Sequence, residues 1–125
     1  MSIPKIVYND RLLNTLGFMM KIGGITLWPW IILREDYKRP LKYYYKKNKE
    51  RVIRHESIHI KQQVELLVIP FYILYLLNFI LNIVTFNGNP YKNICFEKEA
   101  YENEMDLDYL KKRKFWAWRY YIFKK

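Results

Sequence analysis

The spacing of hydrophobic positions predicts the first elements of the chain. Residues 12–20 place apolar side chains at helical spacing, and a pair of glycines ends this pattern. Residues 25–34 are rich in branched and aromatic side chains, which is typical of a strand. Because Pro29 has no N–H to donate to a neighbouring strand, we expect an edge strand. Residues 35–49 are charged and aromatic, and we interpret them as a loop or hairpin.

The second half of the chain has a helical pattern. We expect a helix over residues 50–67, then the uncharged segment 66–86, which has about the ~20 residues needed to span a bilayer. The Asn-Gly-Asn-Pro stretch that follows is a strong turn signal. A last helix is expected over residues 92–113, before an aromatic and basic tail at 115–125. The expected fold class is therefore mainly α (α+β), with one edge strand or hairpin.

Composition narrows the class of protein. A chain of 125 residues should form a single domain, residues 1–125. It is 51% hydrophobic and 18% aromatic, which argues against disorder. Its four glycines form no phosphate-binding loop motif. With Cys95 as the only cysteine and no signal-peptide pattern at the start, we expect no internal disulfide, no export and a cytoplasmic location.

The net charge of +10 is unevenly distributed. Basic residues concentrate in residues 38–54 and in the tail, whereas residues 97–108 are acidic. Such a basic excess attracts the phosphate of nucleic acid or of lipid. A nucleic-acid-binding protein is a minor alternative, because no recognised binding module is visible and the acidic segment would repel phosphate.

The motif HESIH, residues 55–59, contains the only two histidines of the chain. Residues four apart lie on the same face of a helix, so His55 and His59 can bind one Zn²⁺ together at roughly 2.0–2.1 Å. Glu56, beside the first ligand, can act as the general base that takes a proton from a zinc-bound water. This pattern predicts a zinc site that hydrolyses peptide bonds.

A catalytic zinc usually has three protein ligands and one open position. The chain has no third histidine and no second cysteine, so the third ligand must be a carboxylate. Glu65 lies too far along the same helix to complete the site. Residues 96–108 supply the remaining candidates, which are Glu97, Glu99, Glu102 and Glu104.

HESIH at residues 55–59 and EKEAY at residues 97–101 together resemble the pattern of the glutamate zincins. In these peptidases, which include the HtpX and CAAX-prenyl protease group and the ImmA/IrrE group, a second helix supplies a glutamate in an ExxAD or ExxAN context. The resemblance implies a minimal zincin-like domain and a zinc-dependent metallopeptidase. It also implies that Glu97 is the third ligand, because Glu97 lies three residues before Ala100.

A longer resemblance covers most of the chain. The segments HESIHIKQQVELL and NPYKNICFEKEAYENE are similar to a family of small, largely uncharacterised Bacteroidota proteins that carry the same motif, and this family implies no substrate. One position departs from the peptidase pattern: Tyr101 stands where Asp or Asn usually orients a ligand imidazole. A phenol orients less strongly. Tyr101 and Gln62 are the expected hydrogen-bond partners of the metal ligands.

The apolar segment constrains this site. A straight helix over residues 64–86 would be ~33 Å long and would leave Glu97 far from the histidines. A break near Pro70 gives three helices, 50–67, 71–86 and 92–113, that run up, down and up. Glu97 then lies level with His55 and His59. The middle helix would be buried in protein or dipped into a membrane.

Membrane association is the second feature of this interpretation. The tail at 115–125 pairs aromatic with cationic residues, as interfacial segments do. More Lys and Arg precede the segment 66–86 than follow it, which predicts that the HExxH side faces the cytoplasm. The alternative to an enzyme is a non-catalytic membrane-associated or structural protein, with a structural zinc or no metal. We also expect the strand at 25–34 to hold a peptide substrate by strand addition.

Overall fold

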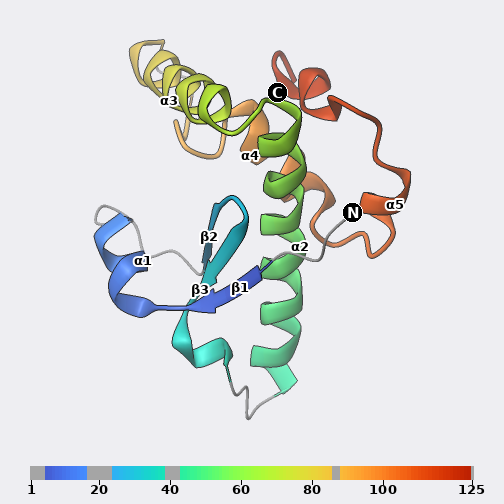
Figure 1. Cartoon of the computed structure of the whole chain (residues 1–125). Helices are drawn as coiled ribbons and strands as arrows, with labels where there is room; N and C mark the ends of the chain where they lie inside the picture. Colours follow the sequence, from blue (N-terminus) through green and yellow to red (C-terminus); the bar gives the residue numbers. More distant parts are fainter. Residues whose placement is uncertain (1–4, 17–23, 39–42, 86–87, 125) are drawn as a thin grey trace. The chain divides into compact units, whose positions relative to one another are not determined.

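The computed structural model describes residues 5–16, 24–38, 43–85 and 88–124 (Figure 1). They belong to two compact units, Met1–Ile60 and Lys61–Lys125. The described residues form α-helices and one small three-stranded sheet, so the predicted fold class, mainly α (α+β), is confirmed.

The sheet of the first unit contains β1 (Lys5–Tyr8), β2 (Gly24–Leu27) and β3 (Trp30–Leu33) (Figure 1). β3 lies in the centre, parallel to β1 and antiparallel to β2. The single edge strand predicted over 25–34 is therefore wrong, and the alternative of a hairpin is correct. Trp28 and Pro29 form its turn, where a residue without an N–H costs no ladder bond.

The start of the chain supplies one strand of this sheet, β1, and the helix that follows it. β1 was not predicted, because a strand of four residues is too short to establish an alternating pattern. α1 (Asp10–Leu16) matches the first part of the helix predicted at 12–20, and the remainder lies outside the described residues. Asn9 accepts the backbone N–H of Leu12 at 2.9 Å and so satisfies one unpaired donor at the start of α1.

The long helix α2 (Tyr43–Glu65) contains the HESIH motif. It begins seven residues earlier than predicted, because the charged residues before Glu50 have no turn signal within them and are good helix formers. The short 3₁₀ helix η1 (Glu35–Tyr37) lies between the sheet and α2 in sequence. The core of this unit joins β3, η1 and α2 through buried Ile31, Leu33, Tyr37, Val52 and Ile60.

A sharp break separates α2 from α3 (Ile69–Val84). Leu67 and Val68 both have positive φ, of 60° and 65°, and the N–H of Val68 donates to the carbonyl of Gln63 at 2.7 Å. Pro70 then lies in the first turn of α3, where its missing N–H costs nothing. The predicted break near Pro70 is confirmed. No single described helix has both the length and the apolar composition to cross a membrane, although α2 and α3 as a bent pair meet those two criteria together.

The segment predicted as one helix over 92–113 forms two separate helices, so that prediction is wrong. α4 (Cys95–Asn103) and α5 (Tyr109–Lys112) are separated by a turn in which the Asp106 carboxylate accepts the N–H of Asp108 at 3.0 Å. Aspartate side chains favour such turns over continued helix, because they compete for backbone donors. The tail forms a second 3₁₀ helix, η2 (Ala117–Tyr121).

The core of the second unit is largely aromatic. Phe96 of α4 lies between Phe71 of α3 and Trp118 of η2, with ring centroids 4.7 and 5.1 Å apart. Asn78 accepts the first N–H of α4, from Cys95, at 2.9 Å and thereby joins α3 to α4. Burial raises the pKa of the Cys95 thiol to about 11, so it remains protonated in the core.

We expect Phe96→Ala to lower the free energy of unfolding by about 3–5 kcal/mol, because the side chain is 1% exposed and its loss leaves a cavity among three aromatic rings. Urea denaturation followed by circular dichroism measures this. Phe123→Ala is the matched control, since Phe123 is 94% exposed and its loss should change little. Equal effects of the two substitutions would contradict this description of the core.

Candidate metal centre

The two histidines of α2 face each other. Their Nε2 atoms lie 3.3 Å apart, the ring planes are nearly perpendicular at 77°, and both side chains are buried. Two nitrogen ligands of a tetrahedral zinc, each ~2.0–2.1 Å from the ion, are themselves roughly 3.3–3.4 Å apart. The separation of the His55 and His59 nitrogens therefore fits one shared metal ion. A hydrogen bond between the two rings fits the same distance.

Glu56 points from α2 to the sheet of the same unit. The hydroxyl of Thr26, on β2, donates to Glu56 Oε2 at 2.6 Å and also lies 3.0 Å from the Glu56 backbone oxygen. Both residues are buried, Thr26 at 4% and Glu56 at 7% exposure. A short hydrogen bond to one carboxylate oxygen holds the group in one orientation, which leaves the other oxygen for a proton-transfer role.

Glu97 belongs to the second unit and lies in the first turn of α4. Its side chain is 3% exposed, and Tyr75 of α3 donates its hydroxyl to Glu97 Oε2 at 2.6 Å. The Tyr75 ring stacks parallel to that of Phe96, so ring packing and the hydrogen bond to Glu97 together fix the orientation of the phenol. A buried carboxylate oriented by a phenol has the properties of a metal ligand.

The competing carboxylates have other partners. Glu102 is on the surface, where Lys124 forms an ion pair with it at 2.6 Å. Glu99 is fully buried but accepts hydrogen bonds from Arg113, Tyr109 and Gln62. Glu104 is buried and also has a partner within the chain. Among the three, these contacts leave Glu99 and Glu102 poorly suited to a metal.

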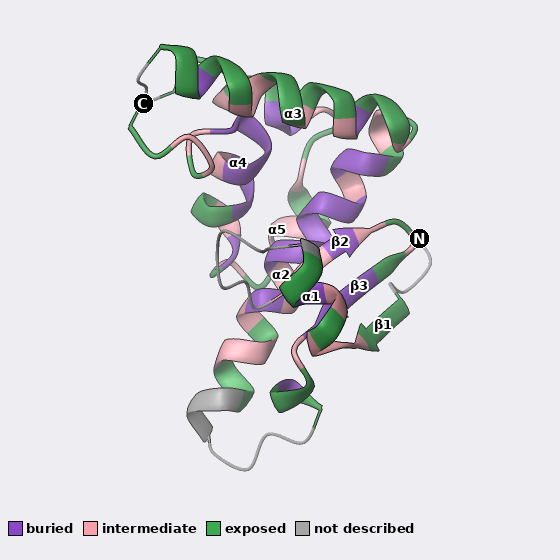
Figure 2. Cartoon of the chain, turned by 90° about the vertical axis from the view of Figure 1, so that its left-hand side faces the viewer, coloured by how far each residue is buried: buried purple, intermediate pink, exposed green. Residues whose placement is uncertain are grey.

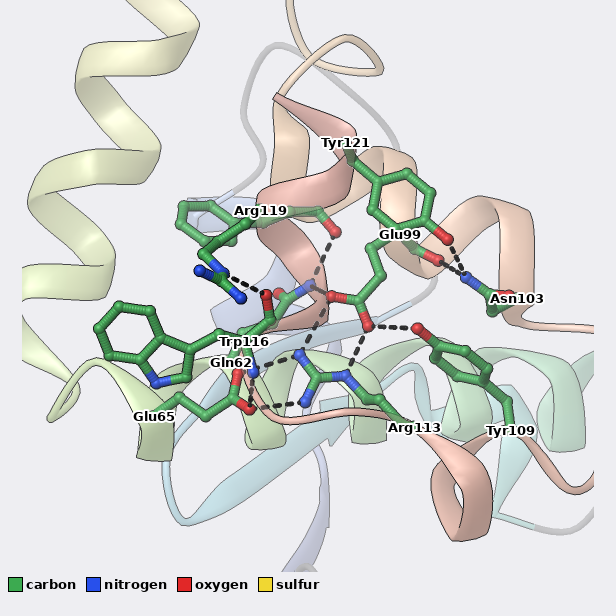
Figure 3. A network of polar contacts seen from close by, with 10 residues as sticks. Gln62, Glu65, Glu99, Asn103, Tyr109, Arg113, Trp116, Arg119 and Tyr121 are labelled. Atoms are coloured by element: carbon green, nitrogen blue, oxygen red, sulfur yellow. Dashed lines mark hydrogen bonds and ion pairs between the residues drawn. The ribbon is translucent and has the colours of Figure 1, made fainter. Parts of the chain in front are cut away.

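Arg113 forms the centre of a buried polar network in the second unit (Figure 3). Its guanidinium donates to both oxygens of Glu65 at 2.8 and 3.0 Å and to both oxygens of Glu99 at 2.6 and 3.1 Å. Burial acts to lower the pKa of Arg113, but the hydrogen bonds to these carboxylates outweigh it and raise that pKa. The arginine therefore stays charged while its side chain is only 3% exposed.

The same network holds the adjoining segments. Tyr109 donates its hydroxyl to Glu99, and burial together with the charge of Glu99 raises the pKa of Tyr109 well above its usual range. Trp116, which has a positive φ of 62°, donates its backbone N–H to Glu65 at 2.7 Å. The carboxylates thus connect the end of α2, the middle of α4 and the start of the tail.

The two predicted partners of the ligands have different surroundings. Gln62 is fully buried, and its amide donates to the Phe96 carbonyl at 3.0 Å and to Glu99 at 3.1 Å. It therefore contacts the residue directly before Glu97. Tyr101 is 37% exposed, and its ring meets the Tyr91 ring edge-to-face under the ammonium group of Lys92. The role predicted for Tyr101 beside an imidazole stays a prediction.

Sequence reasoning missed three residues that shape this region: Thr26, Tyr75 and Arg113. Thr26 is an ordinary strand residue in sequence, and Tyr75 lies within an apolar segment full of aromatic side chains. Arg113 is one of four consecutive basic residues, Lys111 to Lys114, so nothing local distinguishes it from a surface charge. Their roles depend on partners distant in the chain, which no local pattern reveals.

Comparisons of this chain with family models, curated proteins and solved structures found no match. Any functional inference therefore rests on the residues themselves and on their geometry.

Arg113→Met should lower the free energy of unfolding by roughly 3–5 kcal/mol, because it leaves two buried carboxylates without their cation. Chemical denaturation of the purified chain measures the loss. Lys112→Met is the matched control: this neighbouring lysine forms its ion pair with Asp106 at the surface, so little should change. A stability of Arg113→Met equal to that of the control would show that the network contributes nothing.

Proposed function

We propose that this chain is a zinc-dependent metallopeptidase in which His55, His59 and Glu97 bind the metal. The observation that carries the proposal is the 3.3 Å separation of the two buried imidazole nitrogens on α2. The donor set supports it, because two imidazoles and one carboxylate are typical ligands of a catalytic zinc. Each of the three side chains is buried, and each is of a type that holds metal ions.

The continuity of α2 supports Glu97 as the third ligand. Residues at i, i+4 and i+7 lie on one face of a helix, so Gln62 continues the face that carries His55 and His59. Gln62 donates to the carbonyl of Phe96, and Glu97 is the next residue. The resemblance to the glutamate zincins implies the same ligand.

In this proposal Glu56 performs the proton transfers. When bound, zinc would polarise the peptide carbonyl and lower the pKa of water. Glu56 takes a proton from the attacking water and delivers it to the leaving amine, so that the peptide bond ends as a free carboxylate and a free amine. Thr26 holds the Glu56 carboxylate in position for both transfers.

Strand addition of the substrate is also part of the proposal, with a changed location. β3 is paired on both sides and has no free edge. A peptide would have to pair with β1 or β2 instead. The segment 30–33 is therefore excluded from the role predicted for residues 25–34.

Metal content and peptidase activity, measured on the same preparations, test the proposal. We expect about one zinc per chain in the wild type purified without chelator, and loss of zinc in His59→Ala and Glu97→Gln. Glu56→Gln should retain zinc and lose roughly 10²–10⁴-fold in hydrolysis of a fluorogenic peptide library. Glu102→Gln is the control for Glu97→Gln, since Glu102 is paired with Lys124 at the surface.

Other outcomes identify the alternative. Loss of zinc in Glu56→Gln would contradict the role of Glu56 as a base that does not bind the metal. A wild type that holds zinc without hydrolysing any peptide would favour a structural zinc. A wild type without zinc would leave the histidine pair as a hydrogen bond, and the membrane-associated or structural alternative would replace the enzyme.

Tyr75→Phe should weaken zinc binding by about 10–100-fold, because it removes the hydrogen bond that orients Glu97 while the ring stays on Phe96. Competition with a chromogenic chelator measures the affinity, and circular dichroism checks the fold. Tyr120→Phe, at a 64% exposed tyrosine, is the control. Unchanged affinity in Tyr75→Phe would exclude an orienting role for this phenol.

A further inference from the structure

Much of α3 is exposed (Figure 2), and its exposed side chains are apolar, whereas Asn82 is buried and Asn78 is half-buried. A helix in water normally does the reverse. The amide of Asn82, which is 5% exposed, donates to the carbonyl of Pro90 at 2.9 Å, and Asn78 accepts the N–H of Cys95. Both asparagines are therefore used within the second unit. The exposed large side chains of α3 are all aliphatic: Ile69, Ile73, Leu74, Leu76, Leu77, Ile80, Leu81, Ile83 and Val84.

This exposed face is wide and contains no charge. At about 100° per residue, its positions cover roughly half the circumference of α3. Leu67, just before α3, adds a side chain that is 80% exposed. Exposed apolar surface of this extent and continuity marks an interaction site.

A basic and aromatic segment lies next to α3 in the same unit. Residues 111–125 contain seven Lys or Arg and no acidic residue. Trp116, Trp118 and Tyr121 pack in one core cluster with aromatic residues of α3. The exposed Phe115, Tyr120 and Phe123 belong to this segment, and the guanidinium of Arg119 lies 5.9 Å from the rings of both Trp116 and Tyr120.

We propose that α3 and the segment 111–125 bind the surface of an anionic lipid bilayer. The aliphatic face of α3 enters the acyl boundary, and the exposed cations Lys111, Lys114 and Arg119 face the lipid phosphates, whereas Arg113 stays buried with its carboxylates. Exposed aromatic residues beside cations favour the headgroup level, where one end of the side chain is apolar and the other is wet. This inference does not depend on the proposed zinc site.

Charge and shape favour lipid over a second copy of the chain. Two copies that each have a net charge of +10 repel one another, whereas the same charge attracts an anionic membrane. A helix pair buries a narrow seam whose register is set by polar or charged neighbours. α3 offers a broad aliphatic surface without such neighbours, which suits a fluid partner.

The test is flotation of the full chain with phosphatidylcholine vesicles and with vesicles that also contain phosphatidylglycerol. The wild type should float with the anionic vesicles, more weakly with the neutral ones, and less as NaCl rises from ~0.1 to ~0.5 M. Ile73→Gln with Leu77→Gln should weaken binding at least about tenfold, because it places two amides at the centre of the aliphatic face.

The control is Met105→Gln with Leu107→Gln. These residues are 69% and 75% exposed in the same unit and lie outside α3, so binding should be unchanged at equal net charge. A wild type that fails to float with anionic vesicles would overturn the proposal without reference to any variant. Equal flotation of the α3 variant and the control would also overturn it. The proposal would also be overturned if the wild type were a dimer that does not bind vesicles and the α3 variant were a monomer.

Discussion

The second unit depends on the ion pairs that the buried guanidinium of Arg113 forms with Glu65 and Glu99. Removing a charge from water is costly. It is tolerated here because Arg113 donates hydrogen bonds to both oxygens of Glu65 and to both oxygens of Glu99. These two carboxylates lie 34 residues apart in sequence and belong to different helices, α2 and α4. A lysine could supply the charge but not this fork of donors. This one cation therefore links the end of α2 to α4, the helix whose first turn carries Glu97.

In the proposed metallopeptidase, α2 would carry the metal ligands and the general base on two different faces. Its histidines and Gln62 share one face, whereas Glu56 is turned to Thr26 on the sheet. The carboxylate proposed as base is thus oriented by a partner different from those that orient the ligands. With separate partners, the orientation of the Glu56 carboxylate does not depend on the orientation of the metal ligands. This suits a proposed site in which Glu56 must not itself bind the ion.

The second unit distributes polarity in an unusual way. Its polar side chains, Gln62, Glu65, Asn78, Asn82, Glu99 and Arg113, are used internally, whereas aliphatic residues occupy the exposed side of α3. Internal hydrogen bonds allow these polar groups to be buried at little net cost. The aliphatic side chains obtain no comparable benefit in water, and this exposure is what the proposed binding to a bilayer would remove.

Several features of this protein were determined by the sequence alone. The helical spacing of His55 and His59 required them to share a face, and Pro70 required the helix to break near it, because both rules depend only on backbone geometry within one turn. The third-ligand candidates could also be narrowed to the carboxylates of residues 96–108, since the chain has no third histidine and no second cysteine. Only the tertiary structure decided that β3 lies in the centre of the sheet, with Trp28 and Pro29 in the turn before it. It also decided that Thr26 orients Glu56 and that Tyr75 orients Glu97. The burial of Arg113 was likewise visible only in the tertiary structure. The pairing of β1 with β3, the hydrogen bonds from Thr26 and Tyr75, and the Arg113–Glu65 ion pair join residues about 20 to 50 positions apart, and contacts at that range are set by packing rather than by local pattern.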